Sequence, residues 1–314
     1  KLMNKLLFLC YRLWRFNNLY FLKPNDAIND TLTASLLINF DWSGNIVEIG
    51  SGDGVFSYIL HGGYFSLTYD RYSQVNLNKN DIYDNHIKAK IQQKVALSFP
   101  NIEVSIDKKK SHLQKVSEIG FSKKTIQSEY EDLPFPKNSI EKIFYYVPHD
   151  VINYEKSLKK AFDILKPDGR MILLTYESCF KPFFICYRFS KIFKGNLKRF
   201  FEILDNGRYN ELTKLSRSSV KWEQFFVENN MYIEKMESGL SQFAWAVYDT
   251  QTRPFFRFFI TLFNRLNPKL RTFIKICILF ISYPFLLIFY IFFSNQFLPL
   301  GGKSCYLAYQ LRKK

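Results

Sequence analysis

Three glycines that follow a short apolar run are the first residues in this chain whose types and spacing could do chemistry. The run, residues 46–49, has the length and composition of a buried parallel strand. Gly50, Gly52 and Gly54 come next, and residues 55–60 can begin a helix. Glycine lets the backbone turn sharply and lets a ligand approach without meeting a Cβ atom, and a helix start offers unpaired N–H groups. Together these features predict a site for a nucleotide-like ligand.

Two other glycine motifs do not fit this loop. The nicotinamide fingerprint G-x-G-x-x-G requires a glycine where Val55 stands, and the phosphate loop G-x-x-x-x-G-K-[ST] is absent. The arrangement E-x-G-x-G-x-G instead resembles the first motif of the class I S-adenosylmethionine-dependent methyltransferases, of the type 11 kind. That resemblance places Glu48 near the methionine ammonium, and it places the loop with Ser51 under the ligand. Taken alone, the three glycines could instead form an ordinary tight turn that binds no ligand.

Three further stretches follow in the order and spacing of that family. Residues 65–70 read as a second strand that ends in Asp70, 20 residues past Gly50, where a carboxylate could accept the ribose hydroxyls; Arg71 follows it. The stretch S-E-Y-E-D-L-P-F, residues 128–135, resembles G-D-A-E-x-L-P-F, with Glu129 in the place of the adenine-facing acid and Tyr130 beside it. L-K-P-D-G-R, residues 165–170, resembles the turn before the fifth strand. Solvated strand-end acids are the alternative for Asp70 and Glu129.

A fourth strand, residues 140–147, leads to the last group of candidate residues. Tyr146 and His149 stand at its carboxyl end, where open α/β sheets bind ligands. Methyltransferases that act on nucleic-acid bases often carry N-P-P-Y here, and this chain has V-P-H-D, which argues against nucleic acid as the substrate. His149 is a candidate general base because its ordinary pKa is near neutrality, and a structural loop histidine is the alternative. The four histidines and five scattered cysteines show no metal-ligand spacing, so no metal is expected, and the cysteines suggest a reducing compartment.

The charge of the chain is unevenly distributed. Residues 1–180 hold 23 Lys+Arg and 20 Asp+Glu, a net charge of +3, whereas residues 181–314 hold 21 and 8, a net charge of +13. The basic part is also rich in phenylalanine. Basic and apolar segments suit an anionic membrane surface, and basic and aromatic segments could also suit single-stranded nucleic acid.

The pattern of elements predicts an α/β fold with a doubly wound, seven-stranded, mostly parallel sheet of the Rossmann-like methyltransferase kind. We divide the chain into amphipathic helices (1–40), a cofactor-binding core (41–180), a lid and completion of the core (181–251), a membrane-associated helical insertion (252–303) and a last antiparallel core strand (304–314). The first helix, residues 3–22, could cover the domain or lie on a membrane, Pro24 should end it, and a second short helix is expected at 30–40. Helices are also expected at 86–97 and 111–119, with a small extra strand at 102–106.

The segment 276–293 contains 18 residues and no charge, about 27 Å of helix against a bilayer core of about 30 Å. A single crossing would leave the last strand on the wrong side of the membrane for the sheet. Because Pro284 interrupts the segment, we expect two half-helices, 271–283 and 285–295, that enter one leaflet and return. A buried core hairpin is the alternative. Lysines and arginines flank both ends, which favours the cytoplasmic face.

The resemblance implies S-adenosylmethionine as cofactor and methyl transfer as the reaction. The apolar additions favour a hydrophobic or lipid-linked small-molecule acceptor, such as a quinone, a glycolipid or a polyprenyl-linked sugar, taken at a membrane. The alternatives are a nucleic-acid methyltransferase or binding module that uses the basic aromatic region, and an inactive relative that acts as a membrane scaffold. The uncharged 18-residue run disfavours the nucleic-acid alternative, since such surfaces do not need it.

Overall fold

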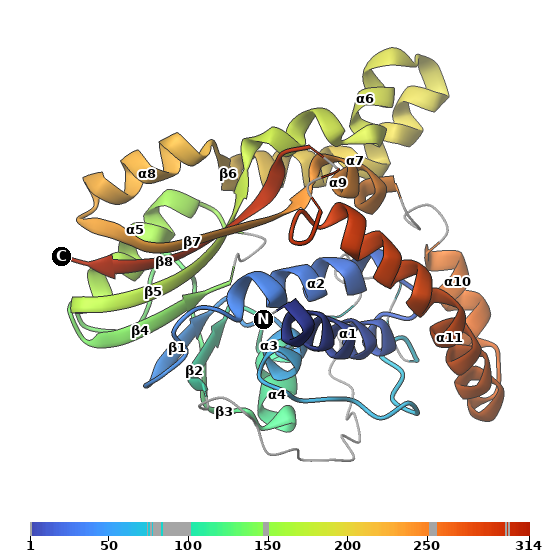
Figure 1. The fold of residues 1–314 in the computed structure, drawn as a ribbon, viewed down its shortest axis with the longest axis horizontal. Coiled ribbons are helices and arrows are strands. Elements are labelled where there is room, and N and C mark those ends of the chain that lie inside the picture. Colours follow the sequence, from blue (N-terminus) through green and yellow to red (C-terminus); the bar gives the residue numbers. More distant parts are fainter. Residues whose placement is uncertain are drawn as a thin grey trace.

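The computed structural model describes residues 2–73, 75, 77, 83, 102–146, 151–250, 256–298, 300 and 302–314, excluding the side chains of 2–5, 206 and 248–250. Within these ranges the chain forms one mixed sheet with helices on both faces (Figure 1). The strands are β1 Ile46–Ile49, β2 Ile102–Asp107, β3 Ser122–Gln127, β4 Ile140–Tyr145, β5 Leu165–Glu177, β6 Ser216–Arg217, β7 Met231–Ser241 and β8 Ser304–Lys313. The helices are α1 Leu2–Leu19, α2 Pro24–Leu37, α3 Val55–Leu60, α4 Lys110–Ile119, α5 Tyr154–Ile164, the 3-10 helix η1 Ser178–Phe183, α6 Ile185–Ile192, α7 Gly195–Leu215, α8 Ser219–Glu228, α9 Gln242–Thr250, α10 Phe256–Asn264 and α11 Pro268–Phe293.

The strand order is β3-β2-β1-β4-β5-β8-β7, and the two-residue β6 pairs beside the end of β5. The strands β1 to β5 are parallel to one another, and β8 runs antiparallel between β5 and β7. The doubly wound, mostly parallel sheet and its antiparallel last strand are therefore confirmed, with eight strands instead of seven because of β6. β1 and the second half of β4 are buried, as their apolar sequences predict.

The predicted second strand is wrong. Residues 65–70 form turns and coil, and the neighbour of β1 is β2, the segment that we expected to be a small extra strand. The residues of β2 alternate between apolar and polar along the whole strand, but Val104 to Asp107 are all buried, so β2 is an interior strand of the sheet. The expected helix at 86–97 lies outside the described residues. A long segment therefore separates α3 from β2, and it contains Asp70.

Helix α1 covers the domain with one face. Leu9, Leu13 and Phe16 are buried, and the Arg15 guanidinium donates hydrogen bonds to the carbonyls of Gly62 and Gly63 after α3. Leu7 on the other face is 64% exposed. Pro24 does not end α1 as expected: α1 ends at Leu19, and Pro24 begins α2, where a missing N–H costs nothing.

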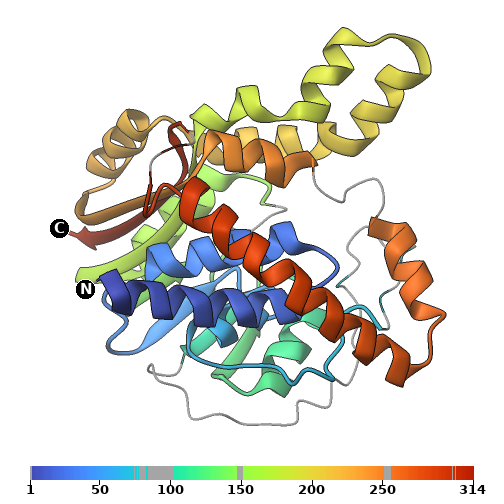
Figure 2. The same ribbon diagram turned by 45° about the vertical axis from the view of Figure 1, so that its right-hand side comes forward.

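Helix α11 is a single helix of 26 residues, so the prediction of two half-helices is wrong. It crosses the outside of α1 and α2 (Figure 2). Tyr283, directly before Pro284, donates from its hydroxyl to the carbonyl of Cys10 at 3.0 Å. Both halves of α11 rest on the same protein surface, and a turn at Pro284 would remove one of them from it. Packing therefore outweighs the hydrogen bond that proline removes.

We predict that Pro284→Ala raises the stability of the protein by about 1–2 kcal/mol. Proline costs about 3 kcal/mol in a helix interior relative to alanine, and part of this is offset because proline also restricts the unfolded chain. Urea unfolding of the two proteins measures the difference. Loss of stability in the variant would show that the native helix needs a bend at Pro284, and would favour the two half-helices over one continuous helix.

Candidate active site

The glycine loop connects β1 to α3 and lies on the end of β2. Gly50, Gly52 and Gly54 all have positive φ, at 80°, 55° and 77°. A Cβ atom at Gly54 would lie 2.8 Å from the Phe121 ring, so this glycine is required for packing. A Cβ atom at Gly52 would meet nothing within 4 Å. Gly52 therefore faces open space, where a ligand could approach the backbone.

Backbone hydrogen bonds hold this loop against β2. The N–H groups of Gly50 and Ser51 donate to the carbonyl of Ile106 at 2.9 and 3.1 Å. The Gly52 N–H donates to Asp107 Oδ2 at 2.9 Å. Ser51 is buried in the loop. The loop and the end of β2 are thus one structural unit.

Asp107 is the acid at the carboxyl end of β2, and sequence reasoning missed it as a site residue. Its carboxylate is 4% exposed and accepts hydrogen bonds from Gly52 N–H, Lys109 N–H and the Tyr130 hydroxyl, the last at 3.1 Å. Burial opposes ionisation of Asp107, but the nearby His112 imidazole and these hydrogen bonds hold its pKa below the usual value. Gly52 and Tyr130 contact Oδ2, and Lys109 and His112 contact Oδ1, so a ligand hydroxyl would share or replace one of these four contacts.

Two predicted residues stand beside Asp107 in the loop after β3. Tyr130 is buried and its hydroxyl bonds to Asp107, so both burial and that carboxylate raise its pKa. Glu129 is exposed, and the preceding Ser128 N–H donates to the carbonyl of Asp107 at 3.2 Å. The ends of β2 and β3 therefore present one buried and one exposed acid at neighbouring positions.

Tyr146 closes the site at the end of β4. Its N–H donates to the carbonyl of Ile49 at 3.1 Å, which places it next to the glycine loop. Its ring stacks on Phe56 of α3 with centroids 4.5 Å apart and planes 6° from parallel. His149 lies outside the described residues, so its role as a base stays a prediction. Among the described residues no group of three or more His, Cys, Asp or Glu could hold a metal.

Comparison with known proteins agrees with this geometry. The family model described as "Methyltransferase domain" matches residues 47–173, which contain the loop, β2, β3, β4 and most of β5. Residues 47–173 form a class I S-adenosylmethionine-dependent methyltransferase domain. The domain's cofactor is S-adenosylmethionine.

Individual relatives are distant. The ubiquinone/menaquinone biosynthesis C-methyltransferases UbiE of Rickettsia bellii and Rickettsia akari are each 26% identical to this chain, over 166 and 156 residues. The matches cover 48% and 47% of this chain, and the chain spans about half the length of these curated relatives, 56% and 52%. The solved structure of YcgJ from Bacillus subtilis is 15% identical, with a TM-score of 0.40 and coverage of 91% and 96% of the two chains. An S-adenosylmethionine-dependent methyltransferase from Thermotoga maritima is 15% identical, with a TM-score of 0.41 and coverage of 73% and 84%.

The residues of the methyltransferase domain fit such a cofactor. Gly52 leaves open space above the loop, Asp107 stands at the end of β2 against the loop, and Glu129 is exposed beside it. The stacked rings of Phe56 and Tyr146 offer an aromatic wall next to the loop. We therefore expect Asp107, at the end of the second strand, to take the ribose-binding role that the family resemblance assigned to Asp70.

Asp70 is engaged elsewhere. Its carboxylate forms an ion pair with Arg271 of α11 and accepts the Tyr72 N–H at 2.8 Å. The assignment to ribose rested on a strand that does not form. The side chain of the neighbouring Arg71 is 7% exposed and donates to Asp53 of the glycine loop at 2.7 Å. Asp70 and Arg71 thus connect α11 to the outer side of the loop.

Glu48 is fully buried under the loop. The hydroxyls of Ser57 and Ser105 donate to its two carboxylate oxygens, to Oε2 at 3.2 Å from Ser105. Burial raises the pKa of Glu48 to about 7, although these two hydrogen bonds favour the ionised form. The side chain is enclosed by β1, β2 and α3, so its contact with the methionine ammonium stays a prediction.

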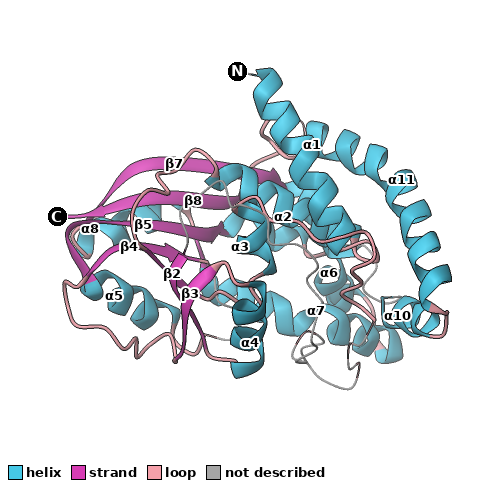
Figure 3. Cartoon of the chain, turned by 90° about the horizontal axis from the view of Figure 1, so that it is seen from below, coloured by secondary structure: helices cyan, strands magenta, loops and turns pink. Residues whose placement is uncertain are grey.

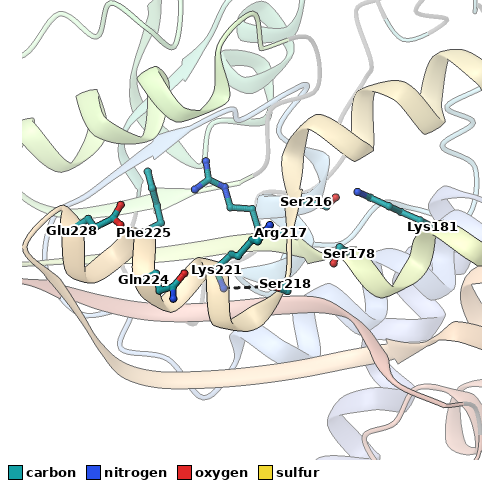
Figure 4. A pocket seen from close by; sticks show the side chains of 9 residues that line it. All are labelled: Ser178, Lys181, Ser216, Arg217, Ser218, Lys221, Gln224, Phe225 and Glu228. Carbon is teal, nitrogen blue, oxygen red and sulfur yellow. Dashed lines mark hydrogen bonds between the residues drawn. The ribbon is translucent and has the colours of Figure 1, made fainter.

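A separate groove of about 530 Å³ lies beyond the end of β5 (Figure 4). Lys181, Arg217 and Lys221 line it together with three serines. The Arg217 guanidinium donates a hydrogen bond to Glu155 Oε2 at 2.8 Å. β6, which contributes Arg217, pairs with Tyr176 and Glu177 at the end of β5. Strand β4 therefore stands between this groove and the glycine loop, and the groove is not part of the cofactor site.

We predict that Asp107→Asn weakens binding of S-adenosylhomocysteine by about 10- to 100-fold, because a charge-assisted hydrogen bond is worth about 1.5–3 kcal/mol. Asp70→Asn is the matched control, and we expect it to change affinity by no more than about twofold. Titration calorimetry measures both. The reverse pattern, with loss only at Asp70, would refute the assignment of Asp107.

We predict that Glu48 makes the stability of the cofactor-free protein fall as pH rises from about 5 to 7, whereas His61, whose pKa burial lowers to about 4, acts in the opposite direction. The native pKa of Glu48 is about 7, above its unfolded value of 4.5, so the native state binds more protons than the unfolded chain in this window. Asp30, whose pKa burial raises to about 7, acts in the same direction. Glu48→Gln should remove up to about 3 kcal/mol of this decrease. Urea unfolding at several pH values tests this, with Asp30→Asn as a parallel variant. An unchanged slope for Glu48→Gln would contradict it.

Proposed function

We propose that this chain transfers a methyl group at a membrane surface to a hydrophobic small molecule of the quinone type, with an aromatic head and an apolar tail. Bound S-adenosylmethionine supplies an already activated methyl group. The residues of the chain then mainly hold cofactor and acceptor in line and exclude water. Asp107, Glu129 and the glycine loop hold the cofactor, and the acceptor approaches past the carboxyl end of β4.

The observation that carries the membrane part is the outer face of α11. Phe273, Phe280, Ile281, Phe285 and Ile288 are between 56% and 68% exposed, although the helix also packs on α1 and α2. Among the described helices, α11 is long and apolar enough to cross a membrane, and only 17% of its most apolar window is buried. An exposed apolar row of this length is rare on a protein that meets only water.

The surrounding charge supports an anionic membrane as the partner. Residues 251–314 contain ten lysines and arginines and no acid. Basic side chains beside an apolar helix are attracted to anionic lipid headgroups. The basic aromatic surface alone could suit nucleic acid, but the uncharged apolar row would then stay in water.

The side of the molecule also fits. β8 ends at the chain end marked C at the left of Figure 1. The parallel strands run in the opposite direction, toward the side on which α6, α7, α10 and α11 lie (Figures 1 and 3). Cofactor sites of open α/β sheets lie at the carboxyl ends of the strands. A membrane on this side would present an apolar acceptor to the site. The Rickettsia relatives are ubiquinone/menaquinone biosynthesis C-methyltransferases, which supports the quinone class.

The test is methyl transfer from isotopically labelled S-adenosylmethionine to membranes, followed by separation of lipid, protein and RNA. We expect label in the lipid extract, in a compound that absorbs as a quinone or its precursor. Asp107→Asn should reduce this label about 10-fold or more at limiting cofactor. Label in RNA or protein, with none in lipid, would contradict the proposal.

A matched variant separates chemistry from membrane contact. Phe280→Ser/Phe285→Ser changes two side chains that are 67% and 68% exposed. It should keep transfer to a short-tailed soluble acceptor and lose most transfer to a long-tailed acceptor in vesicles. Equal activity on both acceptors would show that α11 does not deliver the substrate.

A further inference from the structure

Helices α6 and α7 form a hairpin that projects from the body of the protein (Figure 2). Every residue from 191 to 200, at its tip, is exposed. Six large apolar side chains on or near the tip are more than a third exposed: Phe189 39%, Ile192 68%, Phe193 39%, Leu197 56%, Phe200 48% and Ile203 76%. Folding leaves these side chains in water although the hairpin is well formed.

The base of the hairpin is firmly held. Asp205 of α7 is buried and accepts the Tyr187 N–H of α6 at 3.0 Å. The rings of Tyr187 and Tyr209 stack with centroids 3.7 Å apart. Phe184 packs against Tyr209 and against Trp245 of α9. The hairpin is therefore a supported projection, and its exposed apolar tip is a fixed feature of the fold.

The tip is basic as well as apolar. Residues 185–204 contain Arg188, Lys191, Lys194, Lys198 and Arg199 against one acid, Glu202, a net charge of +4. This acid forms an ion pair within the hairpin, with Glu202 Oε1 3.8 Å from Lys198 Nζ. Lysine and arginine can keep their charged ends at a polar boundary while their stems lie along apolar surface. Apolar side chains between basic ones therefore match the boundary between acyl chains and anionic headgroups.

We propose that the α6–α7 tip inserts into an anionic bilayer, as a second membrane contact separate from the outer face of α11. A second copy of the chain fits less well, because two tips of charge +4 would repel each other and a convex tip buries little against another convex surface. The hairpin lies on the same side of the molecule as α10 and α11 (Figure 1). Two separated contacts on that side would fix the tilt of the protein as well as its attachment. This inference concerns binding alone and does not depend on the acceptor.

The test uses the full chain and extruded phosphatidylcholine vesicles, with and without 30 mol% phosphatidylglycerol as the probe, in a sedimentation assay. Ile192→Ser/Leu197→Ser removes apolar side chains from the tip. Val220→Ser/Val227→Ser on α8 is the matched control, since these residues are 60% and 69% exposed. We expect the tip variant to bind anionic vesicles at least 10-fold more weakly, and the control to stay within about twofold of wild type.

A charge variant, Lys191→Gln/Lys194→Gln/Arg199→Gln, tests the lipid class. It should lose about 10- to 100-fold of the preference for anionic over zwitterionic vesicles. Unchanged affinity for S-adenosylhomocysteine and an unchanged unfolding midpoint verify that the variants fold.

Wild-type vesicle binding by the tip variant would overturn the proposal and leave α11 as the membrane contact. So would a tip variant that changes only self-association, measured by sedimentation velocity without vesicles. Either result leaves the methyl-transfer assay unaffected, so failure of this inference is distinguishable from failure of the proposed function.

Discussion

The insertion of β8 between β5 and β7 is the constraint on which the rest of this structure depends. β8 pairs antiparallel with β5 from Tyr306 opposite Tyr176 to Arg312 opposite Arg170, and with β7 along its other edge. The chain must therefore return to the sheet after residues 252–303. A helix of 26 residues is about 39 Å long, so α11 has the length to cross a bilayer. The pairing of β8 keeps α11 on the surface of the domain instead.

Because the chain returns to the sheet at β8, α11 is held close to the glycine loop. The Asp70–Arg271 ion pair and the Arg71–Asp53 ion pair run in succession from α11 to the glycine loop. Lys275 of α11 adds a hydrogen bond to the carbonyl of Tyr69 at 2.6 Å. Attachment of α11 to a membrane would therefore hold the cofactor loop at a defined place relative to the lipid. A hydrophobic acceptor would then reach the site from the bilayer without crossing water.

Local patterns predicted much of the fold. The glycine loop, the helix expected at 111–119 and the last antiparallel strand each lie where the sequence placed them. The sequence also placed Tyr130 and Tyr146 near strand ends, and they follow β3 and β4 in the structure; their contact with the cofactor stays a prediction. Asp107 was missed because two segments, 65–70 and 102–107, both end an apolar pattern with an aspartate, and only pairing with β1 distinguishes them. The signal that could have found it is the run of apolar residues at 102, 104 and 106 directly before the acid.

Other features depend on tertiary contacts that no local pattern contains. Proline at position 284 predicts a break, but packing on α1 and α2 keeps α11 continuous. The acid before the glycines suggests a ligand contact, yet Glu48 is enclosed between Ser57 and Ser105, one nine residues and the other 57 residues away. The sequence showed the hydrophobic stretch 276–293, but it did not show that this stretch runs over the surface of the domain.

We propose that α11 lies along the domain with both of its ends on one side of a membrane. Single cysteines at Lys269 and Lys303, in a background without the five native cysteines, test it directly when a membrane-impermeant thiol reagent is applied to intact cells that produce the protein. We expect both positions to respond alike, and both to be labelled only after the cells are opened. Labelling of one position and protection of the other in intact cells would show that α11 crosses the membrane, and would contradict the placement of β8 in the sheet.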